Sequence, residues 1–123
     1  MLADIRPSCL LLCLLVAVPS LANASCPPAG WDAAKLGALK AGAFAVAESP
    51  SRQALALGLL GCLGDADPAL RDGIAFEAWT TWLRAGLLDE ETRRHSLVQL
   101  QGAIAPARAD EAGFTQPFAA LVL

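Results

Sequence analysis

The sequence has no tyrosine, a single histidine and a single methionine, and charged residues make up only 17% of its 123 positions. Two of its four cysteines, Cys9 and Cys13, lie in an apolar N-terminal run, so too few cysteines and histidines remain for a zinc site. The nine basic residues are dispersed, and Arg93 and Arg94 form the only adjacent pair. We therefore expect no metal site and no nucleic-acid partner, because nucleic acids are bound through clustered basic surfaces.

Several sequence patterns are also missing. No stretch alternates apolar and polar residues with the period of a strand, and no Asn-Gly or Asp-Gly pair joins two such stretches. The Gly-x-Ser-x-Gly, phosphate-binding-loop and dinucleotide-binding patterns are absent. These absences argue against a β-rich fold and against the common hydrolase and nucleotide-binding classes. No cofactor is expected.

Residues 1–24 have the features of a removable secretory signal peptide. Arg6 precedes an apolar run from Cys9 to Val18, which is too short to span a bilayer. Pro19 breaks this run, and the small residues at 22 and 24 favour cleavage before Ser25. We expect residues 25–123 to form one mature domain in the periplasm or outside the cell, with no membrane contact after cleavage.

Export changes how the two remaining cysteines are interpreted. Cys26 and Cys62 would enter an oxidising compartment, where a disulfide between them would stabilise the fold by roughly 3–4 kcal/mol. The alternative is two unrelated thiols, with Cys62 buried as a small apolar residue. A lipid anchor on Cys26 is a further alternative, disfavoured because Asn23 stands where that signal prefers an aliphatic residue.

Apolar residues return every three or four positions along the mature chain, which predicts an all-α fold of four or five helices packed as hairpins. The expected helices span 31–47, 51–63, 68–84, 89–105 and 115–123, and a polar loop is expected at 107–113. The predicted N-caps are Ser51, Asp67, Asp89 and Thr115.

Glycine, proline and leucine positions refine this prediction. Gly64 is expected in the left-handed conformation that ends a helix, Gly86 is expected to end the next helix, and Pro68 suits a first helical turn. In the second helix, Gly58 and Gly61 indicate close packing against a neighbour. Phe114 is a candidate hydrophobic staple for the last helix. The predicted core face of the fourth helix is Leu97, Val98, Leu100 and Ile104.

Aromatic residues gather on one side of the third helix. Steps of 100° place Phe76, Trp79 and Trp82 on a broad face with Ala75 and Leu83. This spacing is more typical of core packing than of an aromatic pocket or a partner groove, although the three rings are the best candidates for binding.

Among the polar residues, Asp72 is the only catalytic candidate, because the same projection places its carboxylate near Trp79. A first-turn acid that stabilises the helix dipole is the simpler interpretation. Arg71 is expected to tie the turn containing Asp65, Asp67 and Pro68 rather than to grip an anion. Glu77 and His95 are expected at the surface.

The pattern around the main turn resembles a HEAT-type helical repeat. Two helices are joined by a turn that contains Gly64, Asp65, Asp67 and Pro68, and Arg71 stands at the fourth position of the second helix. The resemblance covers residues 55–83. No second repeat is visible, so a long solenoid is not indicated.

The chain also resembles a bacterial family, domain-of-unknown-function family 2785, in three stretches: 52–79, 82–86 and 116–123. This resemblance implies helices throughout and no particular activity. Members of that family look about twice as long, which implies that the chain is a truncated member.

The most consistent interpretation is an exported helical module that binds a periplasmic protein or peptide, or acts as a scaffold, without catalysis. The alternative is the N-terminal fragment of an enzyme whose site is completed by a missing C-terminal half. The sequence identifies neither the ligand nor the oligomeric state.

Overall fold

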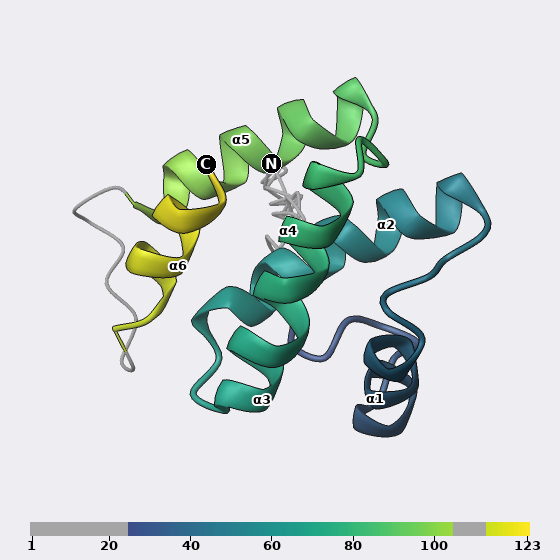
Figure 1. Cartoon of the computed structure of the whole chain (residues 1–123). Helices are drawn as coiled ribbons and strands as arrows, with labels where there is room; N and C mark the ends of the chain where they lie inside the picture. The colour runs from purple at the N-terminus through teal and green to yellow at the C-terminus, as the bar shows by residue number, and fades with distance from the viewer. Residues whose placement is uncertain (1–24, 105–112) are drawn as a thin grey trace, which may run out of the picture.

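The computed structural model describes residues 25–104 and 113–123, and every regular element in them is helical (Figure 1). The all-α prediction is therefore confirmed. The predicted signal peptide and most of the predicted loop at 107–113 lie outside the described residues. No helix in the described part of the chain has the length and hydrophobicity that a membrane span requires.

The elements follow one another as α1 (Ala33–Ala41), α2 (Ser49–Leu59), the 3₁₀ helix η1 (Leu60–Gly64), α3 (Pro68–Leu70), the π-helix η2 (Arg71–Phe76), α4 (Glu77–Arg84), α5 (Glu90–Ala103) and α6 (Thr115–Val122). Residues 68–84 are helical throughout. Trp79 of α4 lies against Ala56 of α2, and Gln53 lies against Leu87, so the two helices run antiparallel as predicted. The core lies between these helices.

The first helix is shorter than predicted. It begins after Asp32, whose carboxylate accepts a hydrogen bond from the Lys35 backbone, and it ends at Ala41 rather than near Ala47. Ala43 and Phe44 then adopt left-handed φ angles of 54° and 59°, which are uncommon for residues with side chains. This turn directs the Phe44 ring into the core, where it is 7% exposed.

The second helix starts earlier than predicted. Ser51 is not its N-cap, because α2 begins at Ser49 with Pro50 in its first turn and with Glu48 at the cap position. Gly58 packs closely, as expected: a Cβ there would lie 2.9 Å from the Cβ of Pro28. Cys26, in the same leader as Pro28, forms a disulfide with the buried Cys62.

The prediction for Gly64 is wrong, whereas that for Gly86 is confirmed. Gly86 has a φ of 67° after the last turn of α4. Gly64 is not in the left-handed region, and its lack of a side chain serves packing instead: a Cβ there would overlap the hydroxyl of Thr115. Glycine at 64 therefore lets α6 approach the end of η1.

The turn between the two long helical runs forms as predicted. Asp67 is the N-cap of α3, with its carboxylate 2.9 Å from the Ala69 backbone nitrogen, and Pro68 occupies the first turn. The π-helix that follows was not predicted. Its wider turns bond Glu77 N to the carbonyl of Asp72, five residues back, so 100° steps do not hold across η2.

Helix α5, which corresponds to the fourth predicted helix, is rotated relative to the prediction. Asp89 caps it as expected, but its buried residues are Thr92, Ser96 and Leu100. Leu100 alone of the predicted core face is buried, whereas the exposed fractions of the others are 44%, 65% and 38% for Leu97, Val98 and Ile104.

A polar contact joins the start of α5 to α2. The Gln53 side chain accepts a hydrogen bond from Asp89 N and donates one to the carbonyl of Leu87, at 3.1 and 2.9 Å. These bonds attach the start of α5 to α2. The buried face of α5 therefore does not follow from its own apolar residues, and contacts outside the helix contribute to its orientation.

Helix α6, which corresponds to the last predicted helix, also begins differently from the prediction. Thr115 is its first residue rather than its N-cap, and Phe114 occupies the cap position. Phe114 lies against Arg71 of η2, at 3.8 Å from the guanidinium carbon to the ring centroid. The contacts of Phe114 and Thr115 with η2 and η1 therefore help to position the start of α6.

Removal of the disulfide tests how far the leader stabilises the fold. The double substitution Cys26→Ala with Cys62→Ala should lower the free energy of unfolding by roughly 3–4 kcal/mol, because the unfolded chain gains conformational entropy. Urea denaturation measures this loss. Wild type treated with reductant is the matched control and should lose a similar amount. An unchanged urea midpoint in both samples would contradict the prediction.

Candidate functional site

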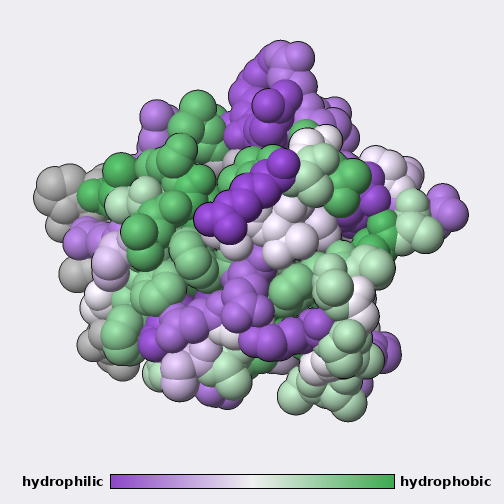
Figure 2. All heavy atoms as spheres, viewed as in Figure 1, coloured by the Kyte–Doolittle hydropathy of each residue, from purple (hydrophilic) through white to green (hydrophobic). Residues whose placement is uncertain are grey.

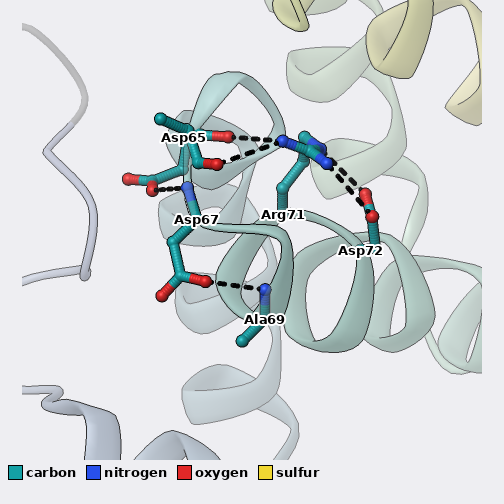
Figure 3. A network of polar contacts seen from close by, with 6 residues as sticks. Asp65, Asp67, Ala69, Arg71 and Asp72 are labelled. Carbon is teal, nitrogen blue, oxygen red and sulfur yellow. Dashed lines mark hydrogen bonds and ion pairs between the residues drawn. The ribbon is translucent and has the colours of Figure 1, made fainter.

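Arg71 is the centre of the polar cluster that the sequence singled out. Its side chain is buried, with 9% of its surface exposed. Figure 3 shows the guanidinium between the backbone of the turn and the Asp72 carboxylate. Its Nε and Nη2 donate to the two Asp72 oxygens at 2.9 and 3.2 Å, and its Nη1 donates to the carbonyl of Asp65 at 3.1 Å.

The face of the Arg71 guanidinium is also occupied. The Phe114 ring lies over it, and the Phe118 ring lies 5.2 Å from its central carbon. The Arg71 guanidinium is hydrogen-bonded along its edges and packed against an aromatic ring on its face. It therefore joins three parts of the fold: the turn, η2 and α6. This geometry corresponds to the structural role expected for Arg71.

The two other acids of the turn bind backbone. Asp65 accepts a hydrogen bond from Asp67 N at 2.8 Å, and Asp67 caps α3 (Figure 3). Neither carboxylate forms an ion pair with Arg71, which instead reaches the carbonyls of Asp65 and Ala66. The turn is therefore organised by cap bonds and by a buried cation on its carbonyls.

Asp72 lies differently from the sequence projection. Its carboxylate is directed at Arg71 and is 47% exposed. The π-helical turn alters the helical angle between Asp72 and the tryptophans of α4, which invalidates the 100° projection. Both Asp72 oxygens accept hydrogen bonds from the Arg71 guanidinium, so the carboxylate serves a structural contact and is not placed against the tryptophans.

The aromatic binding candidates are divided between the core and its edge. Trp79 and Trp82 are 1% and 0% exposed. Their indole nitrogens donate to the carbonyls of Ala56 and Phe44, at 2.8 and 2.9 Å. Phe76 is half-buried and packs edge-to-face against Phe118. Both indoles thus belong to the core.

The surface predictions for Glu77 and His95 agree with the structure. Both residues are exposed, and Glu77 forms an ion pair with Lys40 of α1 at 2.9 Å. His95 lines a hollow of about 360 Å³ between α2 and α5, together with Asp89 and Glu91. Residues 25–104 and 113–123 contain no group of three or more side chains suited to hold a metal ion.

An apolar hollow between α4, α5 and α6 was not predicted. It measures about 230 Å³ and is lined by Trp79, Leu83, Arg93, Ser96, Leu97, Leu100, Val122 and Leu123. Exposed apolar side chains accompany it on the last two helical segments: Leu97, Val98, Ile104, Leu121 and Leu123, which we call the α5–α6 apolar surface. Figure 2 shows hydrophobic side chains gathered over α6 and the adjoining end of α5.

One feature of the sequence anticipates this surface. Leu97 and Val98 are adjacent, so they point about 100° apart on a helix and cannot both occupy the centre of one buried stripe. An excess of apolar residues around α5 is therefore visible before the fold is known. The sequence does not show which of them are exposed, because that depends on the attachment of α5 to Gln53.

A second apolar hollow, of about 310 Å³, lies between α1 and the α3–η2 segment. Its walls include small residues from both sides, Gly37 of α1 and Gly73 of η2. Lys40, which lines it, is paired with Glu77. No unpaired polar group marks it for a ligand.

Comparison with known proteins adds no relative: no protein family, no curated protein and no solved structure was found to match the chain. The resemblances to a HEAT-type repeat and to domain-of-unknown-function family 2785 therefore stay predictions. What the chain can bind has to be inferred from its own surface.

The role of Arg71 is testable by a conservative substitution. Arg71→Lys keeps the charge but loses the planar fork, so it should lower the free energy of unfolding by about 2 kcal/mol. Asp72→Asn should cost less, because the Asp72 side chain is half-exposed and Arg71 keeps its bond to the Asp65 carbonyl. Equal losses in urea denaturation would contradict this order.

Asp89 makes a pH-dependent contribution to the stability of the fold. The Thr92 backbone N–H donates to its carboxylate at 2.7 Å and, with the Thr92 side chain and the nearby Arg93 charge, lowers the pKa of Asp89 below its ordinary 3.8. A lowered folded-state pKa means that the charged carboxylate stabilises the fold above pH 3.8. This contribution is lost as the pH falls through the folded-state value.

Asp89→Ala should therefore lower the melting temperature at pH 7, and the difference from wild type should shrink well below pH 3.8. Asp89→Asn is the matched control, because asparagine caps a helix without charge and should show little of this pH dependence. Thermal melts followed by circular dichroism measure both effects. A difference for Asp89→Ala that stays constant with pH would contradict the assignment.

Proposed function

We propose that this chain is an exported helical module that binds a protein or peptide through the α5–α6 apolar surface. The observation that carries the proposal is the exposure of large apolar side chains on adjoining helices beside a hollow. Leu97 and Leu123 belong to both the surface and the hollow, and their exposed fractions are 44% and 52%. Contiguous apolar patches on a soluble domain are typical of interaction sites.

Export is supported by two independent features. The first is the signal-like sequence of residues 1–24. The second is the disulfide between Cys26 and Cys62, since such bonds persist mainly in oxidising compartments. The Cys26 sulfur is already bonded to Cys62, so it is not available for a lipid. We therefore propose a periplasmic or secreted protein that carries no lipid anchor on this cysteine.

No specific observation among the described residues favours the enzymatic alternative. Its motive was a carboxylate against the tryptophans, and the Asp72 carboxylate is instead paired with Arg71. Binding without catalysis is the function that the described surface supports better.

Affinity capture with matched surface variants tests the proposal. The wild-type protein, used as bait at micromolar concentration in periplasmic extract, should recover a specific partner. Leu97→Ser with Leu121→Ser should lose this partner, because both leucines lie on the proposed surface.

Leu87→Ser is the matched control, because Leu87 is 41% exposed and does not line the hollow. It should retain the partner. Circular dichroism shows whether all variants stay folded. Repeated recovery of no partner, or equal recovery by the double variant, counts against binding through this surface.

A further inference from the structure

The hollow between α4, α5 and α6 has the size of an anchor site rather than of a cofactor pocket. Its volume of about 230 Å³ lies below the range of roughly 300–1,000 Å³ that is usual for small-molecule sites. Its walls are apolar apart from Ser96 and Arg93. A hollow of this kind suits one bulky apolar side chain of a protein partner, as at the centre of many interfaces.

Arg93 is the only residue with a charged side chain among those that line the hollow. No carboxylate of the described residues forms an ion pair with it; its Nε contacts the Asp89 carbonyl at 3.4 Å, which is a weak bond. The Asp89 carboxylate, on which the Arg93 charge acts, is engaged in capping α5. Arg94, one residue on, is by contrast paired with Glu90 at 2.6 Å. The hollow therefore presents a cation that forms no ion pair among the described residues and that an incoming carboxylate can bind.

An apolar floor with Arg93 beside it is complementary to an apolar side chain flanked by a carboxylate. A helix presents such side chains on one face, at positions three and four residues apart.

From this charge complementarity we propose that the hollow binds an acidic amphipathic helix of a partner protein. One leucine-sized side chain fills the hollow, and a carboxylate about one turn away pairs with Arg93. This inference rests on the proposed function and specifies its partner. A second copy of the chain is a poorer occupant, because a symmetric contact brings the same unpaired Arg93 from both sides.

Two synthetic helical peptides serve as probes. Both carry leucines at positions i, i+4, i+7 and i+11; one has glutamates between them and the other has lysines. Binding to the protein purified from the periplasm of an expression host is followed by fluorescence anisotropy. The glutamate peptide should bind at least about tenfold more tightly than the lysine peptide.

Substitutions separate charge recognition from general affinity. Arg93→Glu should reverse the preference between the peptides, and Arg93→Lys should keep it. Arg94→Glu is the matched control, because Arg94 lies on the same helix outside the hollow and is already paired with Glu90. It should leave the preference within about twofold of wild type. An unchanged preference in Arg93→Glu, or an equal effect of Arg94→Glu, overturns the inference.

The two proposals can fail separately. If Leu97→Ser weakens both peptides but Arg93→Glu leaves their ratio unchanged, the apolar surface binds partners and the acidic specificity is wrong. If neither peptide binds and capture from extract also fails, both proposals are wrong. Sedimentation that shows dimers lost on Leu97→Ser would identify a second copy as the occupant and would overturn the acidic-helix inference.

Discussion

The burial of the two tryptophans of α4 is the constraint on which the rest of the structure depends. Trp79 and Trp82 are the largest fully buried side chains, and each contributes roughly 5 kcal/mol of apolar burial. Each indole N–H must also find an acceptor, since an unpaired buried donor costs about 1–3 kcal/mol. Trp79 bonds to Ala56 of α2, and Trp82 bonds to Phe44 after α1. The requirement to pair the indoles thus holds both earlier segments against α4.

A second constraint operates at the opposite end of the hairpin. Arg71 bonds to the turn carbonyls and to Asp72, and the Phe114 ring covers it. Gly64 lets Thr115 approach closely. The start of α6 is positioned by these contacts, and the end of α6 closes one side of the apolar hollow. Arg71, which the sequence predicted to tie the turn, therefore also shapes the proposed binding surface indirectly, through its packing.

The parts that could be predicted from the sequence are those governed by near neighbours in the chain. The caps at Asp67 and Asp89 and the turn at Gly86 follow from contacts within a few residues. The candidate site was less predictable. Arg93 looks like any surface arginine in the sequence, and its place in one hollow with Leu83 and Leu123 is visible only in the tertiary structure.

The sequence by itself determined that the protein is helical, where the main turn lies and that Trp79 and Trp82 face the core, because helical periodicity and capping are local properties. Only the tertiary structure decided the rotation of α5, the π-helical turn at Asp72 and the left-handed turn at Phe44. Each of these depends on residues far apart in the chain or on backbone geometry that side-chain periodicity does not encode. The surface of this protein, and with it any partner, is set by those long-range contacts.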